Sequence, residues 1–314
     1  MKVLYFIVNP QAKNGRCQKV WHKIEKVLER RNVSFQVFFT KGPGHAAEIA
    51  NKLGQQNEGK ETVIGVVGGD GTIHEVMNGI SCHPHLKIGF IPGGSGNDFS
   101  RGFRIPRNPL DALDFFLRLA GENPVFIDMG KISHKESGEI FFINNMGAGF
   151  DAFVATKVNH SPLKKVLNRL SLGKLTYVYV MLKHLFTYRC TQLTLLIDGR
   201  KHKIDNAWFV TVSNQPYFGG GMKIAPQANT QDGLMDITVV HNLARWKLLF
   251  LFATVFWGKH LGLKEVATFK GKEISIISDQ EIYVHAGGEY VGKTPVSISV
   301  FPKKAPILAE LGKS

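Results

Sequence analysis

A glycine-rich segment in the first quarter of the chain has the residue types of a phosphate-binding loop. Val63 to Val67 is an uncharged run typical of a buried parallel strand, and Gly68-Gly69-Asp70-Gly71-Thr72 follows it directly. Glycines let backbone amides approach a phosphate, and a helix from Ile73 would point unpaired N–H groups at the same anion. The Asp70 carboxylate would repel phosphate unless Mg²⁺ or a hydroxyl proton lay between them. The alternative is a tight turn with Asp70 as a helix cap.

The elements around this segment alternate between strand and helix, which predicts an α/β domain with a doubly wound parallel sheet over residues 1–124. The predicted strands are 3–8, 33–39, 63–67 and 87–91. Polar or glycine-rich loops follow them at Asn9, Thr40, Gly68 and Gly93. Because the carboxyl ends of parallel strands share one edge, these four loops predict a nucleotide site there.

The rhythm changes after Pro124, where strand patterns follow one another with few helices between them. Ile197-Asp198-Gly199-Arg200 is a hairpin turn signal. Residues 125–300 are therefore predicted to form a mostly antiparallel β-sandwich domain, and the tail 301–314 is expected to return to the first domain. Two segments, 161–189 and 241–263, mix bulky apolar residues with Lys and Arg. They fit either interfacial helices at a membrane or helices that cover a sheet.

Composition limits the partners. The 314 residues contain 39 Lys and Arg against 25 Asp and Glu, a formal charge of +14, which predicts an anionic partner. The basic residues are scattered and no nucleic-acid module is recognised, so nucleic acid is not expected. Three distant cysteines indicate a reducing cytosol, and the longest uncharged apolar run, 248–258, is too short to span a bilayer. No histidine pair has metal spacing, so no zinc site is predicted.

Taken together, the motifs resemble the diacylglycerol kinase catalytic family, in its soluble bacterial lipid kinase branch, related to sphingosine and ceramide kinases. The resemblance covers nearly the whole chain. It rests on Asn9-Pro10, Thr40, Gly68 to Thr72 with Glu75, Pro92 to Asp98, Asp232-Gly233-Leu234 and Gly288-Glu289. NAD kinases and phosphofructokinases carry similar glycine loops, but Pro-Gly-Gly-Ser-Gly-Asn-Asp-Phe at 92–99 separates this family from them.

The resemblance implies a set of site residues. The implied ATP site comprises Asn9, Pro10, Gln11, Ala12, Lys13, Thr40, Gly68, Gly69, Asp70, Gly71, Thr72, Ile73, His74, Ser95 and Asn97. Ser95 stands where most members have Thr and keeps the hydroxyl. Asn229, Asp232 and the Leu234 carbonyl would bind a structural Mg²⁺, although the residues alone also fit a β-turn.

Glu289 matches the catalytic acidic residue of the family and would act as a base that accepts the proton of a lipid hydroxyl, with Asp70 helping to hold Mg²⁺. The sequence departs from the family here, because the usual Asp-Gly-Glu reads Gly287-Gly288-Glu289. Residues 287–294 also satisfy a Gly-x-x-x-x-Gly-Lys-Thr pattern, but Pro295 and the alternating 296–300 favour strands over the required helix.

The resulting prediction is an ATP- and Mg²⁺-dependent lipid kinase that works in a cleft between the two domains and converts, as best estimate, diacylglycerol to phosphatidic acid. The protein is expected in the cytoplasm, associated peripherally with the anionic inner face of the membrane. The sequence does not decide whether it forms a homodimer. Two alternatives remain: a nucleotide- or lipid-binding regulator that is weakly active or inactive because a carboxylate is missing at 287, and an NAD kinase-like enzyme.

Overall fold

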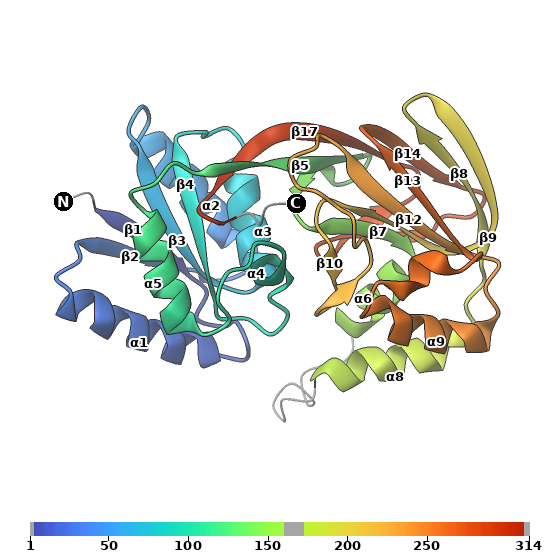
Figure 1. Cartoon of the computed structure of the whole chain (residues 1–314), viewed down its shortest axis with the longest axis horizontal. Coiled ribbons are helices and arrows are strands. Elements are labelled where there is room, and N and C mark those ends of the chain that lie inside the picture. The colour runs from blue at the N-terminus through green and yellow to red at the C-terminus, as the bar shows by residue number, and fades with distance from the viewer. Residues whose placement is uncertain (1–2, 160–172, 311–314) are drawn as a thin grey trace. The chain divides into compact units, whose positions relative to one another are not determined.

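The computed structural model describes residues 3–159 and 173–310, and these form two compact units. The first unit contains the chain up to Met129 and the tail from Pro302, and the second runs from Gly130 to Phe301. Strands β5 (Val125–His134) and β17 (Val296–Ile307) contribute residues to both (Figure 1).

The first unit is a parallel sheet with helices on both faces. Its strand order is β17-β4-β3-β1-β2, and every pairing is parallel. The tail joins this sheet through Ile307, which pairs with Ile88. Besides β17, its strands are β1 (Leu4–Val8), β2 (Phe35–Phe39), β3 (Thr62–Gly68) and β4 (Leu86–Pro92), and its helices are α1 (Arg16–Arg30), α2 (His45–Gln56), α3 (Asp70–Gly79), α4 (Asp98–Gly102) and α5 (Pro109–Leu119).

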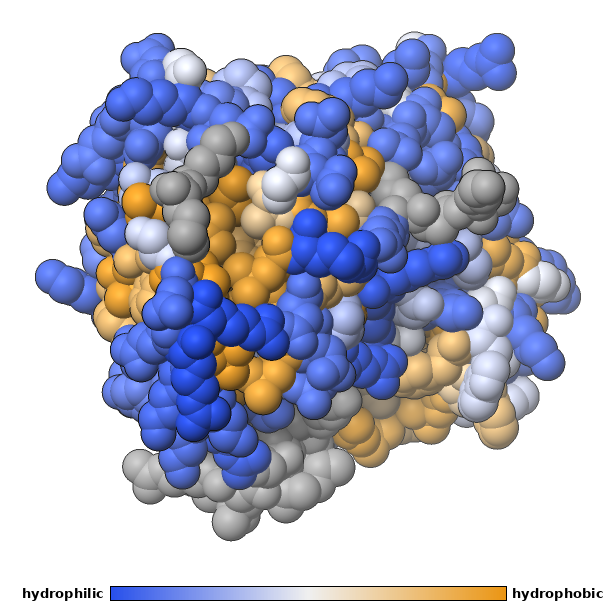
Figure 2. Space-filling view, turned by 60° about the vertical axis from the view of Figure 1, so that its left-hand side comes forward, coloured by the Kyte–Doolittle hydropathy of each residue, from blue (hydrophilic) through white to orange (hydrophobic). Residues whose placement is uncertain are grey.

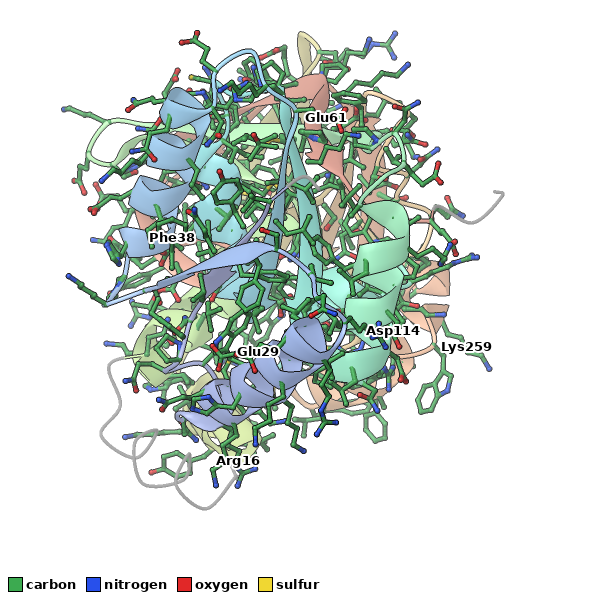
Figure 3. All side chains as sticks on the ribbon, turned by 90° about the vertical axis from the view of Figure 1, so that its left-hand side faces the viewer. Arg16, Glu29, Phe38, Glu61, Asp114 and Lys259 are labelled. Carbon is green, nitrogen blue, oxygen red and sulfur yellow. The ribbon has the colours of Figure 1, made fainter. Side chains whose placement is uncertain are left out.

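Helices α1 and α5 pack together on one side, and α2 packs against α3. At the surface Asp114 of α5 pairs with Arg31, the residue after α1 (Oδ1 to Nη1 2.5 Å; Figure 3). Beneath α1 and α5 the Phe6 ring lies 5.3 Å from Trp21 and 5.5 Å from Phe116 between ring centroids. Gly89 of β4 leaves room for this cluster, since a Cβ there would lie 2.2 Å from the Phe116 ring. The predicted doubly wound α/β fold is confirmed.

The second unit is built from antiparallel pairs, as predicted. Its strand order is β16-β15-β7-β9-β8-β14-β17, with β12 pairing β9 and β13, and β5 pairing β6. Besides parts of β5 and β17, it contains β6 (Gly138–Phe142), β7 (Asn145–Gly149), β8 (Thr191–Ile197), β9 (Arg200–Ser213), β10 (Tyr217–Phe218), β11 (Met222–Lys223), β12 (Met235–His241), β13 (Val266–Gly271), β14 (Glu273–Ser278), β15 (Tyr283–Ala286) and β16 (Glu289–Lys293). The predicted turn at Asp198-Gly199 joins β8 and β9, where Ile197 pairs with Arg200.

Helices line one apolar cluster of this second unit. They are α6 (Phe150–Asn159), α8 (Gly173–Leu185), α9 (Arg245–Val255) and the 3-10 helix η1 (Lys259–Gly262). The buried side of α9, Leu248, Leu251 and Val255, packs in the same cluster as Phe150 and Trp208. The helix expected within 241–263 is therefore present as α9 and η1. Of the segment 161–189, residues 161–172 lie outside the described residues, and α8 forms most of the rest.

Hydrophilic side chains cover most of the face in Figure 2, in keeping with the charge of +14, and apolar residues surface between them. The described residues include no helix long and apolar enough to cross a membrane.

Candidate active site

The four loops after the parallel strands of the first unit are tied together at one edge of its sheet. The Asn9 amide donates to the Thr72 hydroxyl (3.0 Å), which links the loop after β1 to α3. The Gly93 N–H donates to the Gly68 carbonyl (2.7 Å), and the Thr40 N–H to the Val8 carbonyl (2.9 Å). The loops predicted to form a nucleotide site are thus neighbours, as the rule for open parallel sheets requires.

The Asp70 carboxylate caps a helix, but not its own. Asp70 is the first residue of α3, and its oxygens accept from the N–H groups of Asp98 (3.1 Å) and Phe99 (3.0 Å) at the start of α4. Burial raises the pKa of Asp70, whereas the N–H groups of Phe99 and Asp98 and the charge of Arg101 act in the opposite direction. A desolvated carboxylate held in this way favours a neighbouring cation or a shared proton.

Gly96 allows this approach, because a Cβ at that position would lie 2.7 Å from Asp70 Oδ2. The carboxylate therefore fixes the 92–98 loop against the 68–72 loop, two motifs that are separated in the sequence by residues 73–91. Glycine is required at position 96 because a side chain there would collide with the Asp70 carboxylate, and not because the backbone needs an unusual conformation.

The loop after β1 combines a fixed start with an exposed end. The Asn9 side chain accepts from the Gln11 N–H (3.1 Å) while its amide donates to Thr72. Lys13, Asn14 and Gly15 then have φ of 52°, 55° and 80°, so the chain turns through left-handed conformations before α1 begins. The Lys13 side chain is exposed at this turn, where it is available to an anion.

The remaining predicted ATP residues differ in what they offer. Ile73 is fully buried in the core, so it can contribute only through its backbone. Ser95 is exposed. Asn97 has φ 55°, and among the described residues its buried Oδ1 has no hydrogen-bond partner. Burial lowers the pKa of His74 to about 4, which keeps the imidazole neutral at physiological pH.

Glu289 lies in the second unit, exposed at the first position of β16. It follows a two-residue turn, because Ala286 pairs with Glu289 across the hairpin and Gly287 and Gly288 have φ of 58° and 91°. Such a turn requires positive φ at both central positions and accepts Asp-Gly as well as Gly-Gly. Glycine at 287 therefore removes a carboxylate without requiring a different turn. Residues 289–293 form a strand rather than a helix, so the phosphate-loop pattern is not realised.

The loop expected to bind Mg²⁺ is occupied by its own hydrogen bonds. The Asn229 side chain accepts from the Gln231 N–H, and Asp232 Oδ1 accepts from the Leu234 N–H (both 3.1 Å). The Lys270 ammonium lies 3.4 Å from Asp232 Oδ2 and 3.2 Å from Asp236 Oδ2. Since this single ammonium group already pairs with both carboxylates and offsets one of their two negative charges, a divalent ion would have to displace it. Within residues 3–159 and 173–310, no three His, Cys, Asp or Glu side chains are grouped to hold a metal.

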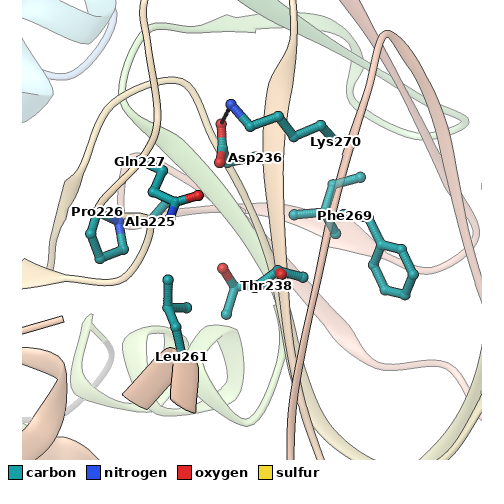
Figure 4. A pocket seen from close by; sticks show the side chains of 10 residues that line it. Ala225, Pro226, Gln227, Asp236, Thr238, Leu261, Phe269 and Lys270 are labelled. Atoms are coloured by element: carbon teal, nitrogen blue, oxygen red, sulfur yellow. Dashed lines mark ion pairs between the residues drawn. The ribbon is translucent and has the colours of Figure 1, made fainter. Parts of the chain in front are cut away.

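A pocket opens beside this ion pair (Figure 4). Asp236 and Lys270 stand at its polar end, and Leu261, Phe269 and Pro226 contribute apolar wall. Lys270 is fixed there by strand register, because it pairs directly with Asp236 across β12 and β13. No local sequence signal marks Lys270, which comes from a strand more than thirty residues after Asp236.

Two family models match the chain. The diacylglycerol kinase catalytic domain matches residues 3–132, and the YegS C-terminal NAD kinase beta sandwich-like domain matches residues 144–309. Solved structures from Bacillus anthracis strain Sterne share the fold. One described as a diacylglycerol kinase has a TM-score of 0.71 at 22% identity, covering 98% of this chain and 97% of its own.

Curated relatives align along almost the whole length. A Bacillus subtilis protein named "Putative lipid kinase YtlR" is 34% identical over 300 residues, which cover 95% of this chain and 96% of that protein. A diacylglycerol kinase of Mycobacterium tuberculosis is 30% identical over 305 residues, covering 96% and 93%. The predicted resemblance is confirmed, and the chain belongs to the diacylglycerol kinase family of lipid kinases, which transfer phosphate from ATP to a lipid.

Proposed function

We propose that this lipid kinase phosphorylates the free hydroxyl of diacylglycerol and releases phosphatidic acid. The observation that carries the proposal is the edge of the first unit, where hydrogen bonds join neighbouring strand-end loops and the half-buried Asp70 carboxylate fixes the 92–98 loop. The names of the Mycobacterium and Staphylococcus carnosus relatives support diacylglycerol as acceptor. The family model that matches residues 3–132 is a diacylglycerol kinase catalytic domain, which argues against the NAD kinase alternative.

In this proposal the phosphoryl donor is ATP carried as its Mg²⁺ complex, bound by the predicted residues from Asn9 to Lys13, Thr40, Gly68 to His74, Ser95 and Asn97. The cation brought with ATP offsets the negative charge of the transferring phosphoryl group. The amides at the start of α3 and the Lys13 ammonium would contact phosphate oxygens. Asp70, which is desolvated and held by the N–H groups at the start of α4, would help to hold the Mg²⁺ that accompanies ATP.

Glu289 is proposed to accept the proton of the lipid hydroxyl. It is exposed, and no second carboxylate stands on its turn because residue 287 is glycine. The proposal therefore gives one carboxylate the task that the family resemblance assigns to an Asp-Gly-Glu turn. A structural Mg²⁺ at Asn229, Asp232 and Leu234 is not part of it, since the Lys270 ammonium already pairs with Asp232 and Asp236.

A surface of the second unit supports work at a membrane. Trp246, Leu249, Phe250, Phe256 and Trp257 are all exposed. They recur at helical spacing along and just after α9, opposite the buried Leu248 and Leu251. Helix α9 has eleven residues and is apolar on both faces, but only one face packs against the rest of the unit, so the other apolar face is left in contact with solvent. At about 1.5 Å per residue the helix is too short to span a bilayer.

Helix α8 continues this apolar face, and exposed lysines lie close to both helices in the sequence. Val178, Tyr179, Leu182 and Phe186 are exposed, and the Arg245 guanidinium donates to the Leu185 carbonyl (2.9 Å), which joins the end of α8 to the start of α9. Lys183, Lys259 and Lys264 are exposed nearby in sequence. Aromatic side chains with a basic border fit the headgroup region of an anionic bilayer, so we assign this α8–α9 surface to the cytoplasmic face of the membrane.

The acceptor is tested by incubating the protein with radiolabelled ATP, Mg²⁺ and vesicles of a total lipid extract, followed by mass spectrometry of the labelled product. We expect phosphatidic acid. Glu289→Gln should lower kcat by about 10² to 10⁴ with an unchanged melting temperature, because general-base catalysis contributes that much and the side chain is exposed. Glu281→Gln, an exposed acid on the same hairpin region, is the control. Label on another lipid, on a dinucleotide or on nothing would contradict the proposal.

The membrane surface is tested by sedimentation with vesicles of phosphatidylglycerol or of phosphatidylcholine. Phe250→Ala with Trp257→Ala should lower binding to anionic vesicles at least tenfold, since each buried aromatic is worth roughly 1.5–3 kcal/mol. Added salt should weaken wild-type binding. Phe39→Ala, an exposed aromatic of the first unit, should change nothing. Equal binding by the double variant, or a loss of self-association instead of vesicle binding, would overturn the assignment.

A further inference from the structure

The two-glycine turn before Glu289 is held at each of its peptide groups. The Gly287 N–H donates to the Asn145 carbonyl on β7 (3.0 Å). The Gly288 N–H donates to His285 Nδ1 (3.3 Å), and the Asn159 amide at the end of α6 donates to the Gly288 carbonyl (3.2 Å). A turn of two glycines would otherwise have wide conformational freedom. These bonds fix the backbone from which Glu289 projects.

The histidine in this arrangement has a defined tautomer. Because Nδ1 accepts the Gly288 N–H, the ring proton must be on Nε2, which lies 3.2 Å from Asp151 Oδ2. The His285 side chain is 1% exposed and that of Asp151 10%. Asp151, at the start of α6, therefore selects the tautomer that leaves Nδ1 free to accept.

The surroundings leave this pair little room for another arrangement. A Cβ at Gly147 would lie 2.0 Å from Asp151 Oδ2 and 2.7 Å from His285 Nε2, so glycine on β7 makes space for the contact. The Phe218 ring stacks on the imidazole with centroids 5.6 Å apart and planes 21° apart. In the described part of the chain, Asp151 Oδ1 has no hydrogen-bond partner. The Asp151 carboxylate is thus held on one side, by the histidine.

We infer that Asp151 and His285 are positioning residues for the Gly287-Gly288 turn and hence for Glu289. The inference rests on the proposed role of Glu289. It also gives a reason for the pair in this chain: with glycine at 287 the turn has no side chain of its own to orient it, and its orientation depends on His285. A misplacement of a catalytic group by about 1 Å can cost about 10²-fold in rate, so the expected defect lies in kcat rather than in KM for ATP.

Two substitutions of His285 separate the two hydrogen bonds. In His285→Asn the amide oxygen takes the place of Nδ1 and can still accept the Gly288 N–H, but it does not reach Asp151. In His285→Gln the amide nitrogen takes the place of Nε2 and can still donate to Asp151, but the Gly288 N–H loses its acceptor. We expect His285→Gln to lower kcat by about 10²-fold and His285→Asn to stay within a few-fold of wild type.

Asp151→Asn completes the test. Asparagine can donate to Nε2 as well as accept from it, so the other tautomer becomes available and kcat should fall about tenfold in the wild-type background. In the His285→Asn background no tautomer remains to be selected, and the same substitution should have no further effect. This non-additivity is not expected from a loss of stability alone.

His134→Asn is the matched control, because His134 bonds the Lys293 carbonyl at the far end of the same hairpin (2.7 Å). All variants are assayed with diacylglycerol in phosphatidylglycerol vesicles at a temperature below every measured melting point. Equal losses in His285→Asn and His285→Gln, an unaffected Asp151→Asn, or an equal loss in His134→Asn would overturn the inference. If Glu289→Gln itself keeps full kcat, the proposed role of Glu289 fails instead, whatever the histidine variants do.

Discussion

The two units hold their predicted catalytic carboxylates in opposite ways. Asp70 in the first unit is half-buried and receives two backbone N–H groups from the start of α4, so its position follows from main-chain geometry. Glu289 in the second unit is exposed, and its turn is fixed partly by the side chains of His285 and Asn159. The first site depends on loops at the edge of a parallel sheet, whereas the second depends on side chains from distant elements. A substitution should therefore affect the two units differently.

The largest effect is expected from Asp70→Asn. The variant removes the charge and puts an amide N–H against the N–H of Asp98 or Phe99, so both the predicted donor site and the 92–98 loop are perturbed. We expect kcat to fall by about 10³-fold, the upper range for one electrostatic group. Steady-state kinetics with radiolabelled ATP measures it. Asp114→Asn, an exposed carboxylate of α5, should keep wild-type kcat. Full activity in Asp70→Asn would remove Asp70 from the mechanism.

A gain is expected from Gly287→Asp, which restores the carboxylate that the family pattern has. Aspartate tolerates the φ of 58° at this position, so the turn should survive. We expect kcat to rise by up to about tenfold, because a second carboxylate on the turn would make Glu289 a stronger base. Gly288→Asp is the matched control, because its φ of 91° suits only glycine well, and it should lose activity. An unchanged kcat in Gly287→Asp would mean that the missing carboxylate does not limit the enzyme.

A smaller effect, on stability, is expected at Lys270. Lys270→Met leaves Asp236, which is largely buried, without its cation, so the free energy of unfolding should fall by about 1 kcal/mol. Without nucleotide, EDTA should leave the wild-type melting temperature unchanged, whereas Mg²⁺ should raise that of the variant. Lys272→Met, on an exposed neighbour, is the control. If EDTA destabilises the wild type, the loop at 229–234 binds a metal after all, in the manner the resemblance implies.

The smallest expected effect is the pH dependence due to His74. Its folded pKa of about 4 lies below the ordinary 6.5, so between these values the unfolded chain binds the proton more readily. Stability from this group is therefore complete above pH 6.5 and is lost as the pH falls toward 4. His74→Gln should reduce the difference in melting temperature between pH 7 and pH 4.5. Burial also lowers the pKa of His260, so part of the slope should persist in the variant. An identical slope in His74→Gln would assign the effect elsewhere.

The sequence predicted most of the first unit because its signals are local. The apolar runs of the sequence form the strands β1 to β4. They end just before or within the loops that carry Asn9, Thr40, Gly68 and Gly93, and the parallel order brings these ends together. The buried face of α1 is less evident from the sequence. It comprises Cys17, Trp21, Ile24 and Leu28, whereas Val20 and Val27 at similar helical spacing are only partly buried. Several apolar residues compete there, and packing against Phe6 decides which are inside.

In the second unit the strands and the Asp198-Gly199 turn were predictable, but α6 was not, since Phe150–Asn159 lacks a clear polar face and follows a glycine-rich strand. Asp151 was therefore missed. No local pattern connects it to His285, 134 residues later. Lys270 was missed for the same reason, because only the β12–β13 register brings it to Asp236.

The amino-acid sequence by itself determined the alternation of elements, the glycine loops and the turn at 287–288, because strand period, helix spacing and positive φ are properties of a few neighbouring residues. The tertiary structure alone decided which side chains meet: Asp70 with the start of α4, Lys270 with Asp232 and Asp236, and Asp151 with His285. Such contacts depend on strand register and helix packing between distant segments, and the free energy that fixes them is shared among many residues.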